Sequence, residues 1–315
     1  MKIVILDGYV ANPGDLSWDE VATQGDLTVY ERTAPGEIVE RCQGAQAIYV
    51  NKIVITDEIM AQLPELKFIG VLATGYNNVD TAAARRRGID VCNVPAYSTN
   101  SVAQLTFSLI LHVTNRVGDY TRTVANGDWT RCKDFSYTLG AIDELCGMTL
   151  GIYGLGNIGK RVAQIANAFG MRVISPTSQA AGSIPSYVEK VSFDQMLEQS
   201  DFITIHSPLT ANNRHLFNTD TFAKMRRGVV LINTARGPII DEQALADALR
   251  SGHLKAAAVD VLEQEPPKED CPLLANDLAD RCFITPHIAW QSVTARKQLL
   301  KISASNLALR KNIVN

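Results

Sequence analysis

Three polar residues, Arg236, Glu265 and His287, have the side-chain types that a reaction at a carbonyl group needs. Each follows an apolar stretch with the composition of a buried strand. Reduction of a 2-oxo acid requires a cation that holds the carboxylate, an acid that protonates the forming alkoxide, and a partner that tunes that acid. Arginine presents a planar fork that matches a carboxylate, and a neighbouring carboxylate favours the protonated form of a histidine ring. The three residues therefore fit hydride transfer to a carbonyl beside a carboxylate.

Each of these residues also has an ordinary interpretation. Taken singly, Arg236 reads as a surface arginine, Glu265 as a solvated acid in the charged run 263–270, and His287 as a loop histidine. Asp260 is a rival for the acid because it also ends a predicted strand, although an aspartate there could equally cap a turn. The residues by themselves leave open which carboxylate is the partner of the histidine.

A cofactor site is indicated by the stretch 149–159. Gly154, Gly156 and Gly159 form a G-x-G-x-x-G motif between an apolar run and a helical pattern, and a second strand follows over 171–175. The first glycine allows a tight turn, the second has no side chain where the backbone must meet a pyrophosphate, and the third permits close helix packing. The start of the helix offers unpaired N–H groups to the anion. This arrangement predicts binding of a dinucleotide, NAD or NADP.

Strands and helices alternate after the glycine loop. The alternation predicts a doubly wound parallel sheet. The carboxyl ends of its strands would bring the three polar residues to the crevice that contains the glycine loop. The expected strands cover 201–205, 228–233, 256–261 and 281–285, and the expected helices cover 193–198, 219–225 and 242–251.

The first third of the chain alternates in the same way and predicts a smaller α/β unit. Thr74, Gly75 and Tyr76 lie in a turn-rich loop at the end of one of its strands, which is where open sheets bind ligands, although an ordinary surface turn would look similar. The expected strands cover 2–6, 47–50, 66–72 and 90–94, and the expected helices cover 36–43 and 56–63.

A long apolar helix from 100 to about 117, with Asn100 or Ser101 as its cap, is expected to lead from the first unit into the second. The segment 126–148 is poorly periodic and reads as an arm or long connection. In this setting such an arm often packs on a second subunit, so a homodimer is expected.

The fold class that follows is α/β, with two Rossmann-like or flavodoxin-like domains. A closing helix over 290–309 is expected to return to the first domain. The dinucleotide-binding domain, residues 100–289, would then be inserted into a discontinuous substrate domain made of residues 1–99 and 290–315.

Composition limits which partners the protein is expected to bind and which compartment it is expected to occupy. The chain has 315 residues and a net charge of −3, with 46% hydrophobic and 20% charged residues. This balance gives no electrostatic footprint for nucleic acid or an anionic membrane. The six cysteines are scattered without a C-x-x-C spacing, so neither a metal site nor a disulfide framework is predicted. No signal peptide or membrane-spanning run is recognised, and we expect a cytoplasmic protein.

Five motifs, in order and over essentially the whole chain, resemble the D-isomer-specific 2-hydroxyacid dehydrogenase family. A softer resemblance, carried by Asn51-Lys52, Ala73-Thr-Gly-Tyr76 and His287-Ile-Ala-Trp290, is to the glycerate dehydrogenase (hydroxypyruvate reductase) branch. The five motifs are Gly154-x-Gly156-x-x-Gly159, His206-Ser-Pro-Leu209, Asn233-Thr-Ala-Arg-Gly237, Val259-Asp-Val261 with Glu265-Pro266, and Thr285-Pro-His-Ile-Ala289.

The resemblance implies reduction of a small 2-oxo acid, hydroxypyruvate or glyoxylate first, to the D-2-hydroxy acid. It implies that Arg236, Glu265 and His287 are catalytic, with Glu265 as the histidine's partner, and it moves Asp260 to the nicotinamide. The substrate would meet Lys52, the backbone of Thr74, Gly75 and Tyr76, and Arg236. The cofactor contacts are expected at Gly154, Gly156, Asn157, Ile158, Gly159, Thr177, His206, Ser207, Pro208, Thr234, Ala235, Asp260 and Ala289.

One departure from the family concerns the coenzyme. Members that use NAD usually carry an acid at the end of the second strand, whereas this chain has Thr177 there and no charged residue from 175 to 183. Neither coenzyme is therefore clearly excluded, and we expect both to be used. Two other readings are kept: a dinucleotide-sensing corepressor that works by binding partners, and formate oxidation, which is disfavoured because the resembling formate enzymes have glutamine in place of Glu265.

Overall fold

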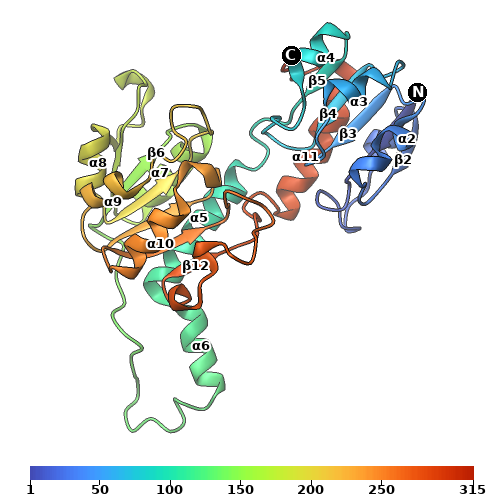
Figure 1. Cartoon of the computed structure of the whole chain (residues 1–315). Helices are drawn as coiled ribbons and strands as arrows, with labels where there is room; N and C mark the ends of the chain where they lie inside the picture. The colour runs from blue at the N-terminus through green and yellow to red at the C-terminus, as the bar shows by residue number, and fades with distance from the viewer. The chain divides into compact units, whose positions relative to one another are not determined.

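The computed structural model describes residues 1–315, except for the side chain of Ala181. The chain divides into two compact units, one made of Met1–Ser98 with Trp290–Asn315 and the other of Thr99–Ala289 (Figure 1). Each unit contains one parallel sheet. The predicted α/β class, with Rossmann-like and flavodoxin-like sheets, is confirmed.

The first unit has a five-stranded sheet in the order β2-β1-β3-β4-β5, which is the flavodoxin-like order. Strand β2 was not expected from the sequence because its four residues are half-exposed on the sheet edge and carry no apolar run. The strands are β1 Lys2–Ile5, β2 Asp26–Val29, β3 Ala47–Val50, β4 Phe68–Val71 and β5 Asp90–Cys92. The helices are α1 Asp19–Ala22, α2 Ile38–Cys42, α3 Asp57–Ala61, α4 Thr81–Arg86 and α11 Val293–Leu309.

Both faces of this sheet are covered. Because side chains alternate along a strand, Ile3 and Tyr49 pack on one face with Leu299 of α11, while Val4 and Ile48 pack on the other face in a second cluster. Strands β3 and β4 are buried along their whole length, as expected of a parallel sheet between two helical layers.

The second unit has a seven-stranded sheet in the order β12-β11-β10-β9-β6-β7-β8. Counted from β6, its first six strands follow the Rossmann order 3-2-1-4-5-6. The strands are β6 Thr149–Tyr153, β7 Arg172–Ser175, β8 Val188–Lys190, β9 Phe202–Ile205, β10 Val229–Asn233, β11 Leu254–Val259 and β12 Cys282–Ile284. The helices are α5 Thr99–Asn115, α6 Val117–Ala125, α7 Asn157–Ala168, α8 Phe193–Gln199, α9 Thr219–Lys224 and α10 Glu242–Arg250.

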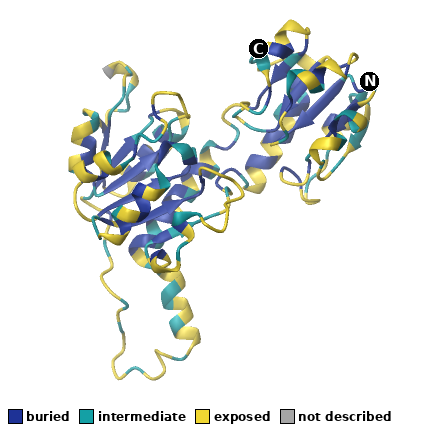
Figure 2. Cartoon of the chain, viewed as in Figure 1, coloured by how far each residue is buried: buried dark blue, intermediate teal, exposed yellow. Residues whose placement is uncertain are grey.

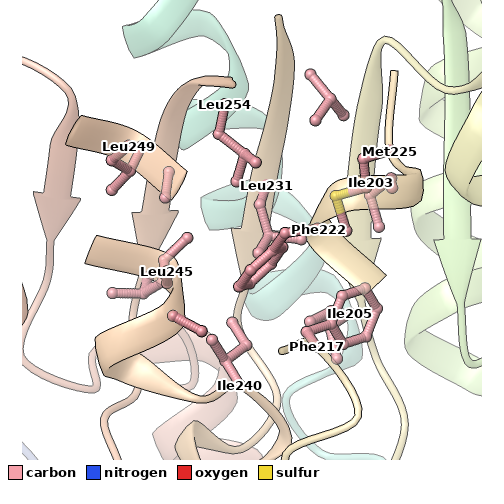
Figure 3. Close-up of a cluster of buried hydrophobic side chains, with 14 of the residues drawn as sticks. Ile203, Ile205, Phe217, Phe222, Met225, Leu231, Ile240, Leu245, Leu249 and Leu254 are labelled. Carbon is pink, nitrogen blue, oxygen red and sulfur yellow. The ribbon is translucent and has the colours of Figure 1, made fainter. Parts of the chain in front are cut away.

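Two apolar clusters lie on opposite faces of the larger sheet. Helices α5 and α7 cover one face, where Phe107 and Val162 pack against Leu150 and Ile232. The other face carries helices α8, α9 and α10. Figure 3 shows part of this cluster, in which the labelled side chains of Phe222 and Leu231 meet. The sheet is therefore rigidly sandwiched, and its strand ends are fixed places from which loops can present functional groups.

The helices next to the arm and at the end of the chain differ from the sequence prediction. Helix α5 begins at Thr99, so Asn100 and Ser101 lie in its first turn and are not its cap. Helix α6 was not predicted; it starts after Arg116, whose left-handed backbone (φ 52°) interrupts the helical run. The closing helix α11 begins at Val293, where the Ser292 hydroxyl caps it, and Trp290 is buried before the helix starts.

Helix α6 and the loop 126–148 project from the second unit and are largely exposed (Figure 2). Helix α6 has no buried residue. Several large apolar side chains along this arm face solvent in the single chain: Val117, Val124, Trp129, Phe135 and Ile142. Across the described residues, none of the helices combines the length and the apolar character that crossing a membrane requires.

Candidate active site

The turn after β10 positions Arg236. Asn233 is fully buried; its Oδ1 accepts the Ala235 N–H at 3.0 Å and its Nδ2 donates to the Arg236 carbonyl at 2.9 Å. The half-buried Arg236 side chain donates from Nη1 to the Ala235 carbonyl at 2.7 Å. Within the described residues its other guanidinium nitrogens donate to no acceptor. They are available for the two parallel hydrogen bonds that a carboxylate accepts.

A glycine joins this turn to the loop after β11. A Cβ atom on Gly237 would lie 1.9 Å from the carbonyl carbon of Leu262, so only glycine permits the two backbones to pack this closely. The Leu262 N–H in turn donates to Oε1 of Glu265 at 3.1 Å. Arg236 and Glu265, which are far apart in sequence, are thus held on two loops in direct contact.

Glu265 is the carboxylate that contacts His287. Oε2 of Glu265 lies 2.6 Å from Nδ1 of His287. The two side chains are 32% and 24% exposed, respectively, which leaves the pair accessible to a small ligand. Because Nδ1 is engaged, the other ring nitrogen, Nε2, is the position from which the ring can give or take a proton. His287 has a left-handed backbone, with φ 55°.

Asp260 holds the loop that carries His287. Its carboxylate is 1% exposed and accepts three hydrogen bonds, from the Thr285 hydroxyl at 2.6 Å, the Ile288 N–H at 2.8 Å and the Ala289 N–H at 2.8 Å. Burial raises the pKa of Asp260, and the hydrogen bonds oppose that shift. The two carboxylates near His287 therefore have different contacts. Glu265 touches the ring, whereas Asp260 binds the backbone N–H groups after His287 and the Thr285 hydroxyl before it.

The glycine loop has the geometry of a phosphate cradle. Gly154 has φ 102°, and a Cβ there would lie 2.5 Å from the Ser207 nitrogen. A Cβ on Gly159 would lie 2.1 Å from the Gly154 carbonyl oxygen, whereas one on Gly156 would meet no atom within 4 Å. Gly156 is the N-cap of α7 and no side chain caps that helix. Open space thus lies where a pyrophosphate would meet the first N–H groups of α7, which include those of Asn157 and Ile158.

The loop after β7 carries the position expected to meet the adenosine ribose. The Thr177 hydroxyl accepts the Gln179 N–H at 3.2 Å, and Gln179 Nε2 donates to the Leu155 carbonyl at 2.7 Å. Two lysines contact the same loop: Lys190 donates to the Gln179 carbonyl and Lys160 to the Ser183 carbonyl, each at 3.0 Å. These cations are hard to predict from the loop sequence, because β8 and α7 supply them from outside the loop.

The loop after β9 contains His206, Ser207 and Pro208. Both ring nitrogens of His206 are buried without a hydrogen-bond partner among the described residues. Burial lowers the pKa of His206 to about 3, so the ring is neutral at physiological pH. Asn213, which sequence reasoning missed, donates from Nδ2 to the Pro208 carbonyl at 2.8 Å and to the Ser207 hydroxyl at 3.2 Å. It fixes this loop beside Gly154.

The remaining residues expected to contact the cofactor lie at the ends of strands of the same sheet. Thr234 is buried, and its hydroxyl lies 3.1 Å from the Thr106 hydroxyl on α5. Ala235 is half-buried and Ala289 is buried. Among the residues that the structure describes, no cluster of three or more His, Cys, Asp or Glu side chains is placed to hold a metal ion.

The first unit carries the residues expected to bind substrate. The Thr74 hydroxyl donates to the Val94 carbonyl at 2.9 Å, and Asn93 Nδ2 donates to the Thr74 carbonyl at 2.7 Å. The N–H groups of Thr74, Gly75 and Tyr76 donate to no acceptor in the described part of the chain. Three successive free N–H groups at a strand end suit a carboxylate. Lys52 is exposed directly after β3.

Comparison with known proteins gives consistent matches. The family model described as D-isomer specific 2-hydroxyacid dehydrogenase, NAD binding domain, matches residues 107–289. Hydroxypyruvate reductase from Blautia hydrogenotrophica is 41% identical over 314 residues, covering 98% of this chain and 96% of that protein. Glycerate dehydrogenase from Methylorubrum extorquens is 40% identical over 279 residues, covering 88% and 85%. The solved structure of an acyclic imino acid reductase in complex with NADPH and D-Arg has a TM-score of 0.84 and 28% identity, covering 100% and 99%.

Proposed function

Because the chain belongs to the D-isomer-specific 2-hydroxyacid dehydrogenase family, we propose that it reduces hydroxypyruvate or glyoxylate to the D-2-hydroxy acid with NADH or NADPH. The observation that carries the proposal is the contact of 2.6 Å between Glu265 and His287, on a loop packed against the turn of Arg236. A cation, a proton donor and a partner for that donor are the groups that reduction of a 2-oxo acid requires.

Each catalytic residue has one task. The guanidinium of Arg236 binds the substrate carboxylate and orients the adjacent carbonyl. The imidazolium of His287 gives its Nε2 proton to the oxygen of that carbonyl as the alkoxide forms, and Glu265 stabilises the protonated ring through Nδ1. Asp260 keeps the His287 loop in place through the Ile288 and Ala289 N–H groups.

The cofactor residues have the complementary task of binding the dinucleotide. When bound, a nicotinamide dinucleotide supplies the hydride. Gly156 and the start of α7 would hold its pyrophosphate, and Thr177 would lie beside the adenosine ribose. The fit is supported by the open space at Gly156 and by the uncapped start of α7.

The first unit is proposed as the substrate domain. Its candidate groups are the ammonium of Lys52 and the free N–H groups of Thr74, Gly75 and Tyr76, all at carboxyl ends of strands. The second unit would then be the dinucleotide-binding domain, inserted between the two parts of the first.

The test is a panel of 2-oxo acids assayed with NADH and with NADPH. We expect turnover of hydroxypyruvate or glyoxylate, and we expect His287→Ala to lower kcat by about 10²–10⁴ with the Kd for NADH nearly unchanged, because only proton transfer is removed. No turnover of any 2-oxo acid, together with tight dinucleotide binding, would favour a dinucleotide-sensing binding protein instead. Turnover by His287→Ala at the wild-type rate would remove His287 from the mechanism.

We further infer that the arm formed by α6 and residues 126–148 mediates a homodimer. The support is its exposed apolar side chains, with Phe135 91% and Trp129 52% exposed, because such patches mark interaction sites. Sedimentation equilibrium should give twice the monomer mass, and Phe135→Asp with Trp129→Lys should give the monomer. A monomeric wild-type protein would contradict this assignment.

A cytoplasmic location is also proposed. Its support is that all six cysteines have free thiols, three of them buried, which suits a reducing compartment. Cell fractionation with antibody detection tests it, and recovery in an oxidising compartment would contradict it.

A further inference from the structure

The carboxylate of Asp7 lies at the topological switch point of the first unit's sheet. In the order β2-β1-β3-β4-β5 the crossover direction changes between β1 and β3, and open α/β sheets bind ligands at the carboxyl ends of the strands there. Asp7 follows β1, and Asn51, Lys52 and Ile53 follow β3. The two strands are paired directly, with Ile5 opposite Tyr49.

The carboxylate of Asp7 gathers three consecutive backbone amides. Its Oδ1 accepts the Asn51 N–H at 2.7 Å, and its Oδ2 accepts the Lys52 N–H at 2.7 Å and the Ile53 N–H at 3.2 Å. Burial raises the pKa of Asp7, and these three hydrogen bonds oppose the shift. Removing a carboxylate from water costs free energy. Because Asp7 spends its hydrogen bonds on one short segment, we infer that the backbone conformation of that segment is important.

The same segment is tied to the other candidate substrate loop. Asn51 is 4% exposed, and its Nδ2 donates to the Leu72 carbonyl at 2.7 Å. Leu72 directly precedes the loop of Ala73 to Tyr76. Oδ1 of Asn51 is buried without a hydrogen-bond partner in the described chain. An unpaired buried acceptor costs free energy, and a residue with only a structural role here would not need to carry that cost. A continuous chain of contacts thus runs from Asp7 through the 51–53 segment to the 72–76 loop.

We propose that Asp7 is a positioning residue for substrate binding, which fixes the backbone of Asn51, Lys52 and Ile53 so that the Lys52 ammonium is presented to the anionic 2-oxo acid. The inference rests on the proposed reduction of a 2-oxo acid. Asp7 does not touch the reacting atoms; it acts through Lys52. Because a flexible lysine loses much rotamer freedom when it binds, a fixed backbone beneath it lowers the cost of binding substrate.

Asp7→Asn is the direct test. The substitution keeps the size of the side chain but directs an NH₂ group at amide donors, so the segment loosens. We expect the KM for the 2-oxo acid to rise about tenfold or more with kcat much less affected, the pattern for loss of uniform binding. The Kd for NADH should stay unchanged. Hydrogen exchange of the amides of residues 51–53 should accelerate, a readout that does not depend on activity.

A double-mutant cycle with Lys52→Met separates positioning from general stability. If Asp7 acts through Lys52, the KM of Asp7→Asn with Lys52→Met should be close to that of Lys52→Met alone, because the two residues act as a unit. Asp80→Asn is the matched control, since the Asp80 carboxylate also accepts a backbone N–H, that of Ala83 at 2.9 Å, but at the start of α4. It should leave KM unchanged.

Two results would overturn the proposal. One is an unchanged KM in an active Asp7→Asn protein. The other is a double variant in which the effects of Asp7→Asn and Lys52→Met on log KM simply add. These results differ from a failure of the proposed function, which would appear as the absence of turnover by the wild-type protein with every 2-oxo acid.

Discussion

Oε2 of Glu265 lies 2.6 Å from Nδ1 of His287, although 22 positions separate the two residues in sequence. The contact exists because the loops after β11 and β12, which are neighbouring parallel strands, leave the sheet at the same edge. It occupies Nδ1 and leaves Nε2 as the nitrogen from which the ring can give or take a proton.

Glu265→Gln should slow reduction without weakening coenzyme binding. Glutamine can still hydrogen-bond the ring, but it lacks the negative charge that stabilises the protonated imidazole needed to give a proton. We expect kcat for the 2-oxo acid to fall by about tenfold or more, while the Kd for NADH stays nearly unchanged. The measurements are steady-state kinetics and NADH titration of both proteins. An unchanged kcat would mean that Glu265 does not act on the ring electrostatically.

Arg236→Lys should be severely damaging although it keeps the charge. A lysine ammonium is a point charge and cannot reproduce the paired hydrogen bonds of a guanidinium with a carboxylate. We expect kcat/KM for the 2-oxo acid to fall by about 10²-fold or more, the effect of losing roughly 3 kcal/mol of charge-assisted bonding. The Kd for NADH is the internal control. Unaltered kinetics would show that Arg236 is not the carboxylate anchor.

Lys190 should favour NADPH. Its ammonium lies 3.0 Å from the Gln179 carbonyl, beside the loop of Thr177, where an NADP 2′-phosphate would be bound. The native protein should use both coenzymes, and Lys190→Glu should lower kcat/KM for NADPH about tenfold relative to NADH by like-charge repulsion. Thr177→Asp should act in the same direction.

Arg172→Gln is the matched control for the coenzyme test. Arg172 begins β7 and pairs with Glu189 at 2.6 Å, at the end of the strand opposite to the ribose loop. It should leave the NADH/NADPH ratio of kcat/KM unchanged. Equal losses with both coenzymes in Lys190→Glu would mean that the lysine only holds the loop.

His206 should make the protein less stable in acid. Its folded-state pKa is lowered to about 3 from an ordinary value of 6.5, because both ring nitrogens are buried. The unfolded chain therefore takes up a proton below pH 6.5 that the folded chain takes up only near pH 3. The free energy of unfolding falls as the pH is lowered through this window, by about 2 kcal/mol at pH 5.

The stability measurement compares urea unfolding of the wild-type protein and His206→Gln at pH 7 and pH 5. Glutamine does not titrate, so the loss of stability between the two pH values should be smaller in the variant by about 2 kcal/mol. Each protein's own free energy of unfolding at pH 7 serves as its reference. Identical losses in both proteins would show that His206 is not held neutral on folding.

The sequence by itself determined the class of the fold and the family of the protein. Its alternating apolar runs predicted two α/β units, because buried parallel strands need continuous apolar stretches whatever their neighbours are. The family resemblance, now confirmed by the matching relatives, came from short motifs such as Gly154-x-Gly156-x-x-Gly159, whose residue types are dictated by contacts made within a few residues. Edge strand β2 was missed because it lacks such a stretch.

Only the tertiary structure decided which polar side chains contact one another. From sequence, Glu265 and Asp260 both follow one strand, and residue type alone cannot tell them apart. The fold buries Asp260 under the N–H groups of Ile288 and Ala289 and leaves Glu265 beside the ring of His287. The contacts of Asp7 with Lys52 and of Lys190 with Gln179 likewise join residues at or after the ends of neighbouring strands. Such partnerships depend on strand order and register, which short-range patterns do not encode.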